Sequence, residues 1–283
     1  MIVAARLALL LGQRTARLFL LPACLYFMIV APKARTASRD YLRRVLERNV
    51  TWRDVCRHFL FFGTCLLDRL YFLAGRYDVP DLTVTNEETI IHATRDGKGC
   101  LLLSAHFGSF EALLALGRVK HSRAPSLLMY QENARKVQAL FRAINPDLEL
   151  DIIDLGRPDA LILAAERIRT GHCVGLLADR DLNGRDLLAM PFLGDDALFP
   201  RGPYRLAMAL RCPVVMVVGL HQGMGRYEIV FHSLSSALSA RPSDPELWVE
   251  ETMRCYTRNL EQLCRAAPLN WFNYFDFWSK GSR

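Results

Sequence analysis

Residues 100–111 read CLLLSAHFGSFE, and this stretch decides the class of fold. Cys100–Ala105 is a short apolar run of the kind that forms a buried strand. His106 and Gly108 follow it directly, and an apolar pattern with helical spacing begins at Phe110. Functional residues of open α/β sheets collect at the carboxyl ends of strands. The stretch therefore predicts a strand, a turn and a helix, with His106 at the edge of a sheet.

The chain after this junction keeps alternating between strand and helix patterns. We predict strands at Cys100–Ala105, Ser126–Tyr130, Leu150–Leu155, Cys173–Ala178, Val214–Leu220 and Tyr227–Phe231. We predict helices at Phe110–Val119, Ala134–Ile144, Asp159–Thr170, Tyr204–Leu210 and Pro245 to about Ala266. Before the junction, residues 37–75 look helical. Strands that alternate with helices predict an α/β fold, with a mainly parallel or mixed sheet covered by helices on both faces.

The composition is that of a folded protein, because 51% of the 283 residues are hydrophobic and 23% are charged. Eight cysteines are scattered without a CxxC pair, which indicates reduced thiols and a domain that faces the cytosol. The histidines other than His106 show no paired ligand spacing, so we predict no metal and no cofactor.

The first 60 residues carry eleven Lys and Arg against three Asp and Glu, although the net charge of the whole chain is only +7. Leu18–Ala31 is an uncharged run of about 14 residues, and a transmembrane helix needs roughly 20. A signal peptide is disfavoured because no convincing cleavage site follows. A buried core helix and an interfacial anchor remain, and we favour the anchor because basic residues flank the run. We predict a membrane-associating helical segment at 1–45 and a second domain at 46–283.

His106 and Glu111 are the candidates for acid–base chemistry. On one continuous helix, positions five apart diverge by roughly 140°, but across a strand–turn–helix junction the Glu111 side chain can fold back onto the imidazole. A carboxylate on one ring nitrogen leaves the other nitrogen free to take a proton, as a general base requires. The alternative is a structural histidine bonded to the backbone, with a solvated glutamate in the first helical turn. The pattern alone leaves both open.

Two further stretches suit a binding site. Residues 175–181, GLLADRD, place Asp179 and Arg180 at a strand end, and a loop rich in Gly and Pro follows at 190–203. This region suits a phosphate or a pantetheine arm, or else it is a loop with surface ion pairs. Residues 271–278, WFNYFDFW, line an acyl groove or the lipid interface, or else they pack into the core.

The ordered set of these motifs resembles the lipid A late acyltransferase family, part of the lysophospholipid acyltransferase superfamily, over nearly the whole chain. In this resemblance, His106 of the HX4E motif corresponds to the family's base and Glu111 to its acidic partner. Tyr130 and Arg142 correspond to the block that follows, with shorter spacing before the arginine. The superfamily's acidic-Gly-Thr phosphate motif is replaced here by PRGP at 200–203, which affects how the acceptor is recognised.

The resemblance implies a membrane-associated acyltransferase on the cytoplasmic face of the cell inner membrane. The donor would be a thioester of acyl carrier protein, or of coenzyme A, and the acceptor a hydroxyl of a membrane lipid or glycolipid, as in lipid A biosynthesis. The substrate-binding candidates are Tyr130, Arg142, Asp179, Arg180 and Arg201. Two other classes stay open: an acyl thioesterase that uses the same His–Glu pair, and a non-catalytic membrane tether. No nucleic acid partner is expected, because no recognised module accompanies the basic segment.

Overall fold

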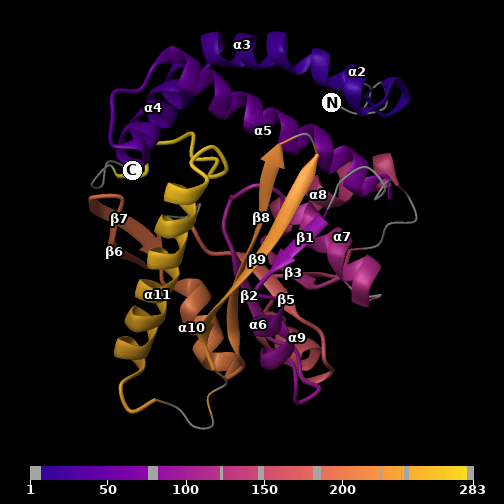
Figure 1. Ribbon diagram of the computed structural model, residues 1–283. Coiled ribbons are helices and arrows are strands. Elements are labelled where there is room, and N and C mark those ends of the chain that lie inside the picture. The colour runs from indigo at the N-terminus through magenta and orange to yellow at the C-terminus, as the bar shows by residue number, and fades with distance from the viewer. Residues whose placement is uncertain are drawn as a thin grey trace.

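Seven strands form one sheet in the order β1–β9–β8–β2–β5–β3–β4 (Figure 1). Their bounds are Leu82–Thr85 (β1), Leu101–Ser104 (β2), Ser126–Met129 (β3), Ile152–Asp154 (β4), Val174–Leu177 (β5), Val214–Gly223 (β8) and Arg226–Ser235 (β9). Strands β8, β2, β5, β3 and β4 are parallel, β9 is antiparallel to β8, and β1 is parallel to β9. The computed structural model describes residues 8–75, 82–121, 124–145, 150–180, 186–223, 225–236, 238 and 242–278. Within them, the predicted α/β class with a mixed sheet is confirmed.

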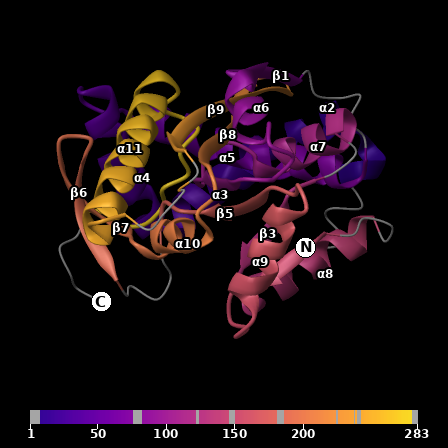
Figure 2. The same ribbon diagram turned by 90° about the horizontal axis from the view of Figure 1, so that it is seen from below.

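Helices cover both faces of this sheet. Their bounds are Gln13–Leu18 (α2), Leu20–Val30 (α3), Pro32–Leu46 (α4), Trp52–Leu73 (α5), Glu87–Ala93 (α6), Phe110–His121 (α7), Gln131–Ile144 (α8), Ala160–Arg169 (α9), Gly202–Leu210 (α10) and Pro245–Ala266 (α11). Helices α6 and α7 lie on one side, and α10 and α11 on the other (Figure 2). Successive strand residues point to opposite faces. Leu102 therefore joins the core with α7, whereas Leu101 and Leu103 join the larger core with α11.

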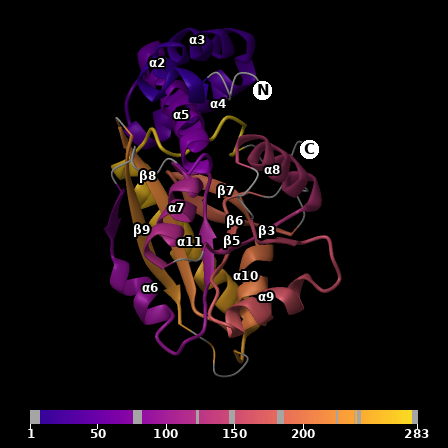
Figure 3. The same cartoon turned by 90° about the vertical axis from the view of Figure 1, so that its right-hand side faces the viewer.

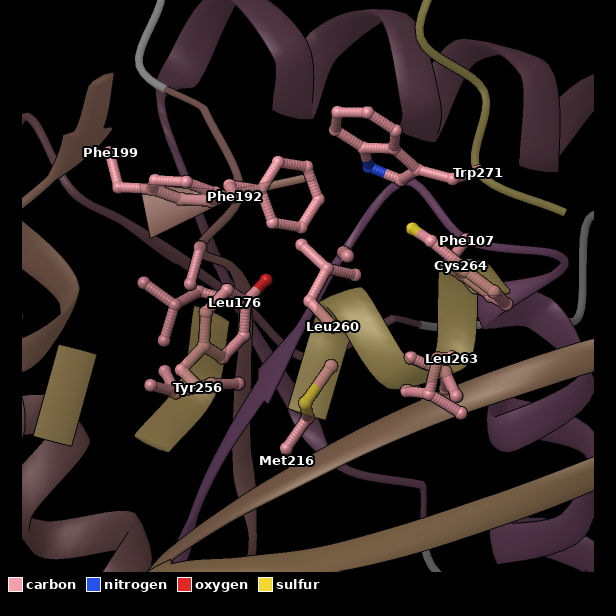
Figure 4. Packing of buried hydrophobic residues seen from close by; sticks show 14 of the residues in the cluster. Phe107, Leu176, Phe192, Phe199, Met216, Tyr256, Leu260, Leu263, Cys264 and Trp271 are labelled. Atoms are coloured by element: carbon pink, nitrogen blue, oxygen red, sulfur yellow. The ribbon is translucent and has the colours of Figure 1, made fainter. Parts of the chain in front are cut away.

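The larger core continues beyond the sheet into a hairpin of β6 (Leu187–Phe192) and β7 (Asp195–Pro200). The ring of Phe192 packs edge-on against Phe199 and Trp271, with centroids 5.4 and 5.3 Å away (Figure 4). Four rings of the aromatic tail are buried: Trp271, Phe272, Phe277 and Trp278. These rings therefore pack into the core, which was one of the two alternatives for this stretch.

The loop predicted at 190–203 is wrong over most of its length, because residues 187–200 form the β6–β7 hairpin. Leu193 and Gly194 connect the strands with φ values of 51° and 84°, the left-handed values that a two-residue hairpin turn requires. A Leu in this conformation is uncommon, so the residue type at the turn gave little sign of it.

The region 37–75 is helical as predicted, but it is divided, because α4 ends at Leu46 and α5 begins at Trp52. Glu47 ends α4 in the left-handed region with a φ of 51°. Thr51 then caps α5 in a capping box, in which its side chain and that of Asp54 each accept from the other's backbone N–H. The two helices share one apolar pattern, but the chain changes direction between them.

Helices α2, α3 and α5 lie across the end of the sheet toward which β8 runs (Figures 1 and 3). Asp68 of α5 accepts hydrogen bonds from Gln13 at 2.7 Å, from Arg17 at 3.2 Å and from the Tyr227 hydroxyl at 2.9 Å. A buried carboxylate thus joins α2 to the sheet. In α3, only Cys24 is buried.

Within the described residues, no single helix combines the length and apolarity needed to cross a bilayer. The stretches Thr15–Val30 and Pro32–Leu46 meet that test of length and composition only as a pair, with a bend of 100° between them.

Candidate active site

His106 lies in the turn after β2, and backbone contacts hold this turn on several sides. The Tyr256 hydroxyl of α11 donates to the carbonyl of Ser104 at 2.9 Å, at the end of the strand. The C-terminal tail runs beside the turn, where the Phe272 N–H donates to the His106 carbonyl at 2.9 Å. The Gly108 N–H in turn donates to the Asn270 carbonyl at 2.8 Å. The backbone under His106 is therefore fixed by α11 and by the tail.

Gly108 is needed where this turn passes β8. Its φ is 59°, in the left-handed region. A Cβ at Gly108 would lie 1.8 Å from the carbonyl oxygen of Gly219, and a Cβ at Gly219 would lie 2.2 Å from that of Ser109. The Ser109 N–H donates to the Gly219 carbonyl at 2.8 Å. Gly108 and Gly219 thus allow the backbone of the His106 turn to contact the backbone of β8.

Asp179, at the carboxyl end of β5, makes the contact that defines the site. Its Oδ1 lies 2.8 Å from Nδ1 of His106, and its Oδ2 accepts from the His106 backbone N–H at 3.2 Å. Because a carboxylate only accepts, Nδ1 carries the proton, and Nε2 of the neutral ring is left with its lone pair. The side chain of Asp179 is fully buried, whereas that of His106 is 40% exposed. Asp179 therefore holds the imidazole of His106 from the protein interior, and the rest of the ring is exposed to solvent.

The remaining capacity of the Asp179 carboxylate is used by two more donors. Arg180 donates to Oδ2 at 3.0 Å, and the indole N–H of Trp271 donates to the same oxygen at 3.3 Å. Burial opposes ionisation of Asp179, but the charges of Arg180 and His106 and their hydrogen bonds outweigh it and hold its pKa well below its usual range. Asp179 is thus a carboxylate at neutral pH.

Glu111 does not take the place predicted for it beside the imidazole. Within the described residues it makes no hydrogen bond to His106. Its Oε1 forms an ion pair with Nε of Arg69 at 2.7 Å, and its Oε2 accepts from the Ser109 hydroxyl at 3.2 Å. The helix α7 begins at Phe110, so Glu111 sits in the first helical turn and faces α5. Asp179 makes the bond that the sequence assigned to Glu111.

The other predicted binding residues are spread over the structure. Tyr130 is exposed directly after β3, on the same edge of the sheet as His106. Arg180 lies beside the site, with its guanidinium 4.8 Å from the centroid of the Phe275 ring. Arg142 is exposed in the last turn of α8. Arg201 precedes α10 and pairs with Glu246 at 3.2 Å, so the structure gives it a carboxylate partner away from His106.

Three backbone N–H groups around Gly108 are bonded within the protein. The N–H groups of Phe107, Gly108 and Ser109 all donate to protein carbonyls, at 2.7 to 2.8 Å. These three groups are therefore not free to stabilise a developing negative charge. Arg180 remains as a cation next to the imidazole.

A family model described as bacterial lipid A biosynthesis acyltransferase matches residues 69–278, most of the chain. The chain belongs to this family. The match includes β2, the His106 turn, Asp179 and the tail up to Trp278. No individual curated protein matches the chain.

In this acyltransferase, the sequence located His106 but not the residue that holds it. Asp179 was visible as a polar residue at a strand end, yet its pairing with His106 depends on β2 and β5 being neighbours in the sheet. Trp271 was visible only as part of an aromatic run, and nothing in that run indicated an indole N–H on the carboxylate. The only signal in the sequence for Asp179 and Trp271 was therefore their position at the end of a strand or beside one.

Proposed function

We propose that this acyltransferase moves a fatty acyl chain from a thioester to a hydroxyl of a membrane lipid or glycolipid, as in lipid A biosynthesis. The observation that carries the proposal is the hydrogen bond between Nδ1 of His106 and the buried carboxylate of Asp179. It leaves Nε2 as the one basic atom of the ring, on a side chain that is open to a substrate.

In the reaction, Nε2 of His106 takes the proton of the acceptor hydroxyl as its oxygen attacks the thioester carbonyl. The tetrahedral intermediate then collapses, the carbon–sulfur bond breaks, and the leaving thiol takes the proton from Nε2. Asp179 holds the imidazole in place and stabilises the imidazolium between these steps. Glu111 acts through Arg69 and Ser109 as a positioning residue for the turn.

Charged and polar side chains at the carboxyl edge of the sheet support substrate binding. Arg180 lies beside the His106–Asp179 pair, through its bond to Asp179, and it stabilises the oxyanion. Tyr130 and Arg142 contact the acyl donor or the acceptor headgroup, and both are exposed. Arg201, paired with Glu246, takes part in docking of the donor protein. Acyl carrier protein is acidic, so a net positive chain attracts it as a donor.

The acyltransferase works at the membrane surface, with α3 in the interface. Large apolar side chains of α2 and α3 are exposed, and they include Leu18, Phe19, Tyr26, Phe27 and Ile29. Exposed apolar patches of this kind mark interaction sites with proteins or membranes. Lys33, exposed directly after the patch, is placed to meet anionic headgroups of the cytoplasmic leaflet of the inner membrane.

The test is transfer of a labelled acyl group to membrane lipid extract, with acyl carrier protein and coenzyme A thioesters compared as donors. We expect labelled lipid as the product and loss of transfer in His106→Ala. Labelled free fatty acid in the absence of any acceptor would instead support the thioesterase. Wild-type rates in a folded His106→Ala protein would rule out the mechanism.

A further inference from the structure

A cavity of about 620 Å³ lies between the α3–α4 corner and the start of α5, on the outer side of these helices. It is lined by Met28, Arg35, Thr36, Arg39, Val50, Thr51, Trp52 and Val55. A cavity of this size is in the range of small-ligand sites. It involves none of the residues around His106.

Two arginines give the cavity its charge. Arg35 and Arg39 are four positions apart on α4 and therefore lie on the same side of the helix. Arg35 donates to the Met28 carbonyl at 2.9 Å, and within the described residues neither arginine has a carboxylate partner. The nearby carboxylates are engaged elsewhere, since Asp40 pairs with Arg43 and Arg44, and Asp54 pairs with Arg48.

The start of α5 forms another wall of the cavity. Thr51 is the N-cap of this helix of 22 residues, and Thr51 and Trp52 both line the cavity. The N-terminal end of a helix carries a partial positive charge and favours anions. The Asp54 carboxylate already caps this end of α5, so the two guanidinium groups are the charges that the cavity offers to an anion. No carboxylate is among its lining residues.

The remaining walls are apolar and continue onto the exposed surface of α3. Met28, Val50 and Val55 line the inside, and Trp52 stands at the rim with 65% of its surface exposed. Phe27 and Val30, next to Met28 on α3, are exposed as well. A free inorganic anion gains nothing from such walls, whereas a lipid places its phosphate on the arginines and its first methylenes on the apolar side chains. Tryptophan is enriched at this depth of a bilayer.

We propose that this cavity binds the phosphate headgroup of an anionic membrane phospholipid. The proposal rests on the membrane association proposed above and assigns it a specific headgroup site, separate from the site of acyl transfer. A bound headgroup fixes the α3–α4 corner at the membrane surface. Because α3 and α5 lie across the end of the sheet toward which β8 runs, this contact orients the edge that carries His106 relative to the bilayer (Figure 1).

The test compares binding of the full chain to vesicles of phosphatidylcholine alone and of phosphatidylcholine with phosphatidylglycerol. Each arginine near an anionic surface contributes about five-fold to binding, so Arg35→Gln with Arg39→Gln should weaken binding to the anionic vesicles by about 30-fold. Binding to phosphatidylcholine alone should stay near that of the wild type. The matched control is Arg43→Gln with Arg57→Gln, which removes the same charge from α4 and α5 outside the cavity and should have a clearly smaller effect.

An equal loss in the two double variants would overturn the proposal, because the attraction would then be a diffuse effect of net charge. Saturable binding of inorganic phosphate without vesicles, lost in the cavity variant, would reassign the cavity to a soluble anion. Acyl transfer to a detergent-dispersed acceptor should be unchanged in Arg35→Gln with Arg39→Gln. If the wild type transfers no acyl group at all, the proposed reaction fails, while the vesicle comparison still decides the headgroup site.

Discussion

At the scale of single residues, Asp179 is the side chain on which the proposed chemistry depends most after His106. Asp179→Asn keeps the size of the side chain but removes the negative charge that stabilises the imidazolium. We expect kcat for acyl transfer to fall on the order of 100- to 10,000-fold with little change in KM. Steady-state kinetics on a variant with an intact circular dichroism spectrum measures this, and a kcat within a few-fold of wild type would contradict the assignment.

Glu111 gives the matched comparison, because it is a carboxylate of the same region with different partners. Glu111→Gln removes the charge that faces Arg69 but leaves His106 and Asp179 in contact. We expect a smaller loss of kcat than in Asp179→Asn, together with a loss of stability on the order of 1 kcal/mol. Urea unfolding and kinetics on the same preparations separate the two effects. A loss of kcat equal to that of Asp179→Asn, at unchanged stability, would restore Glu111 as the direct partner.

The sequence located the base because His106 follows an apolar run and precedes a glycine, and these are local features. The partner of His106 is 73 positions away and becomes adjacent only through the order of strands in the sheet. Glu111 is nearer in sequence, but Arg69 of α5 draws its carboxylate to another helix. For a residue as distant in sequence as Asp179, the strand pattern predicts only that it lies at the same edge of the sheet as His106. It does not predict the contact between them.

At the scale of elements, His58 joins α5 to α4 and to the tail. Its Nε2 donates to the Trp271 carbonyl at 3.0 Å, and in the neutral ring its Nδ1 accepts from the Ser38 hydroxyl at 2.8 Å. Burial lowers the pKa of His58 to about 4, although the bond to Trp271 opposes this shift.

The pH dependence of stability follows from that shift. An unfolded His58 takes up a proton below about pH 6.5, whereas the folded one stays neutral down to about pH 4, so the folded state loses stability as the pH falls through this window. We expect wild type to lose about 3 kcal/mol more than His58→Gln between pH 7 and pH 4. Urea unfolding at each pH measures the difference, and parallel curves would contradict it.

Three glycines test how tightly the His106 turn is built. Gly202 begins α10, and a Cβ there meets open space, so Gly202→Ala should be neutral or slightly stabilising. Gly194 also faces open space but has a φ of 84°, so Gly194→Ala should cost about 1–2 kcal/mol. Gly108 has a positive φ and would clash with the Gly219 carbonyl, so Gly108→Ala should cost the most, about 2–4 kcal/mol, and should lower kcat. Equal melting temperatures of the three variants would show that the His106 turn accommodates a Cβ at Gly108 without loss of stability.

The elements themselves were largely predictable, because buried strands such as β5 and β8 are continuous apolar runs. The β6–β7 hairpin was not, because its turn uses Leu193 in a conformation that Leu seldom adopts. The break between α4 and α5 was missed for a similar reason, since Glu47 takes a left-handed φ there. Both errors arise where tertiary packing imposes a backbone that the residue type does not favour.

At the scale of the whole molecule, the N-terminal helices are joined to the rest by more than a linker. Tyr41 of α4 is fully buried and donates to the Pro268 carbonyl at 2.9 Å, and the boundary predicted at residue 45 falls inside α4. Deleting residues 1–35 would also remove Gln13 and Arg17 from the buried Asp68. We therefore expect that truncation to destabilise the protein, and surface substitutions give a cleaner test of membrane binding.

Phe19 and Phe27 are suited to that test, because they are 62% and 58% exposed on the surface proposed to enter the interface. Replacing both with Glu removes two rings and adds two charges, and each buried ring is worth about 1.5–3 kcal/mol of transfer. We expect vesicle binding to fall by more than about 100-fold while the melting temperature stays near that of wild type. The matched control is Ile162→Glu with Leu247→Glu, which changes two equally exposed apolar residues on α9 and α11, at the opposite end of the molecule from α3 (Figure 1). Flotation with phosphatidylcholine vesicles measures binding without headgroup charge. An equal loss in the control pair would mean that the exposed apolar face of α2 and α3 is not the surface that meets the membrane.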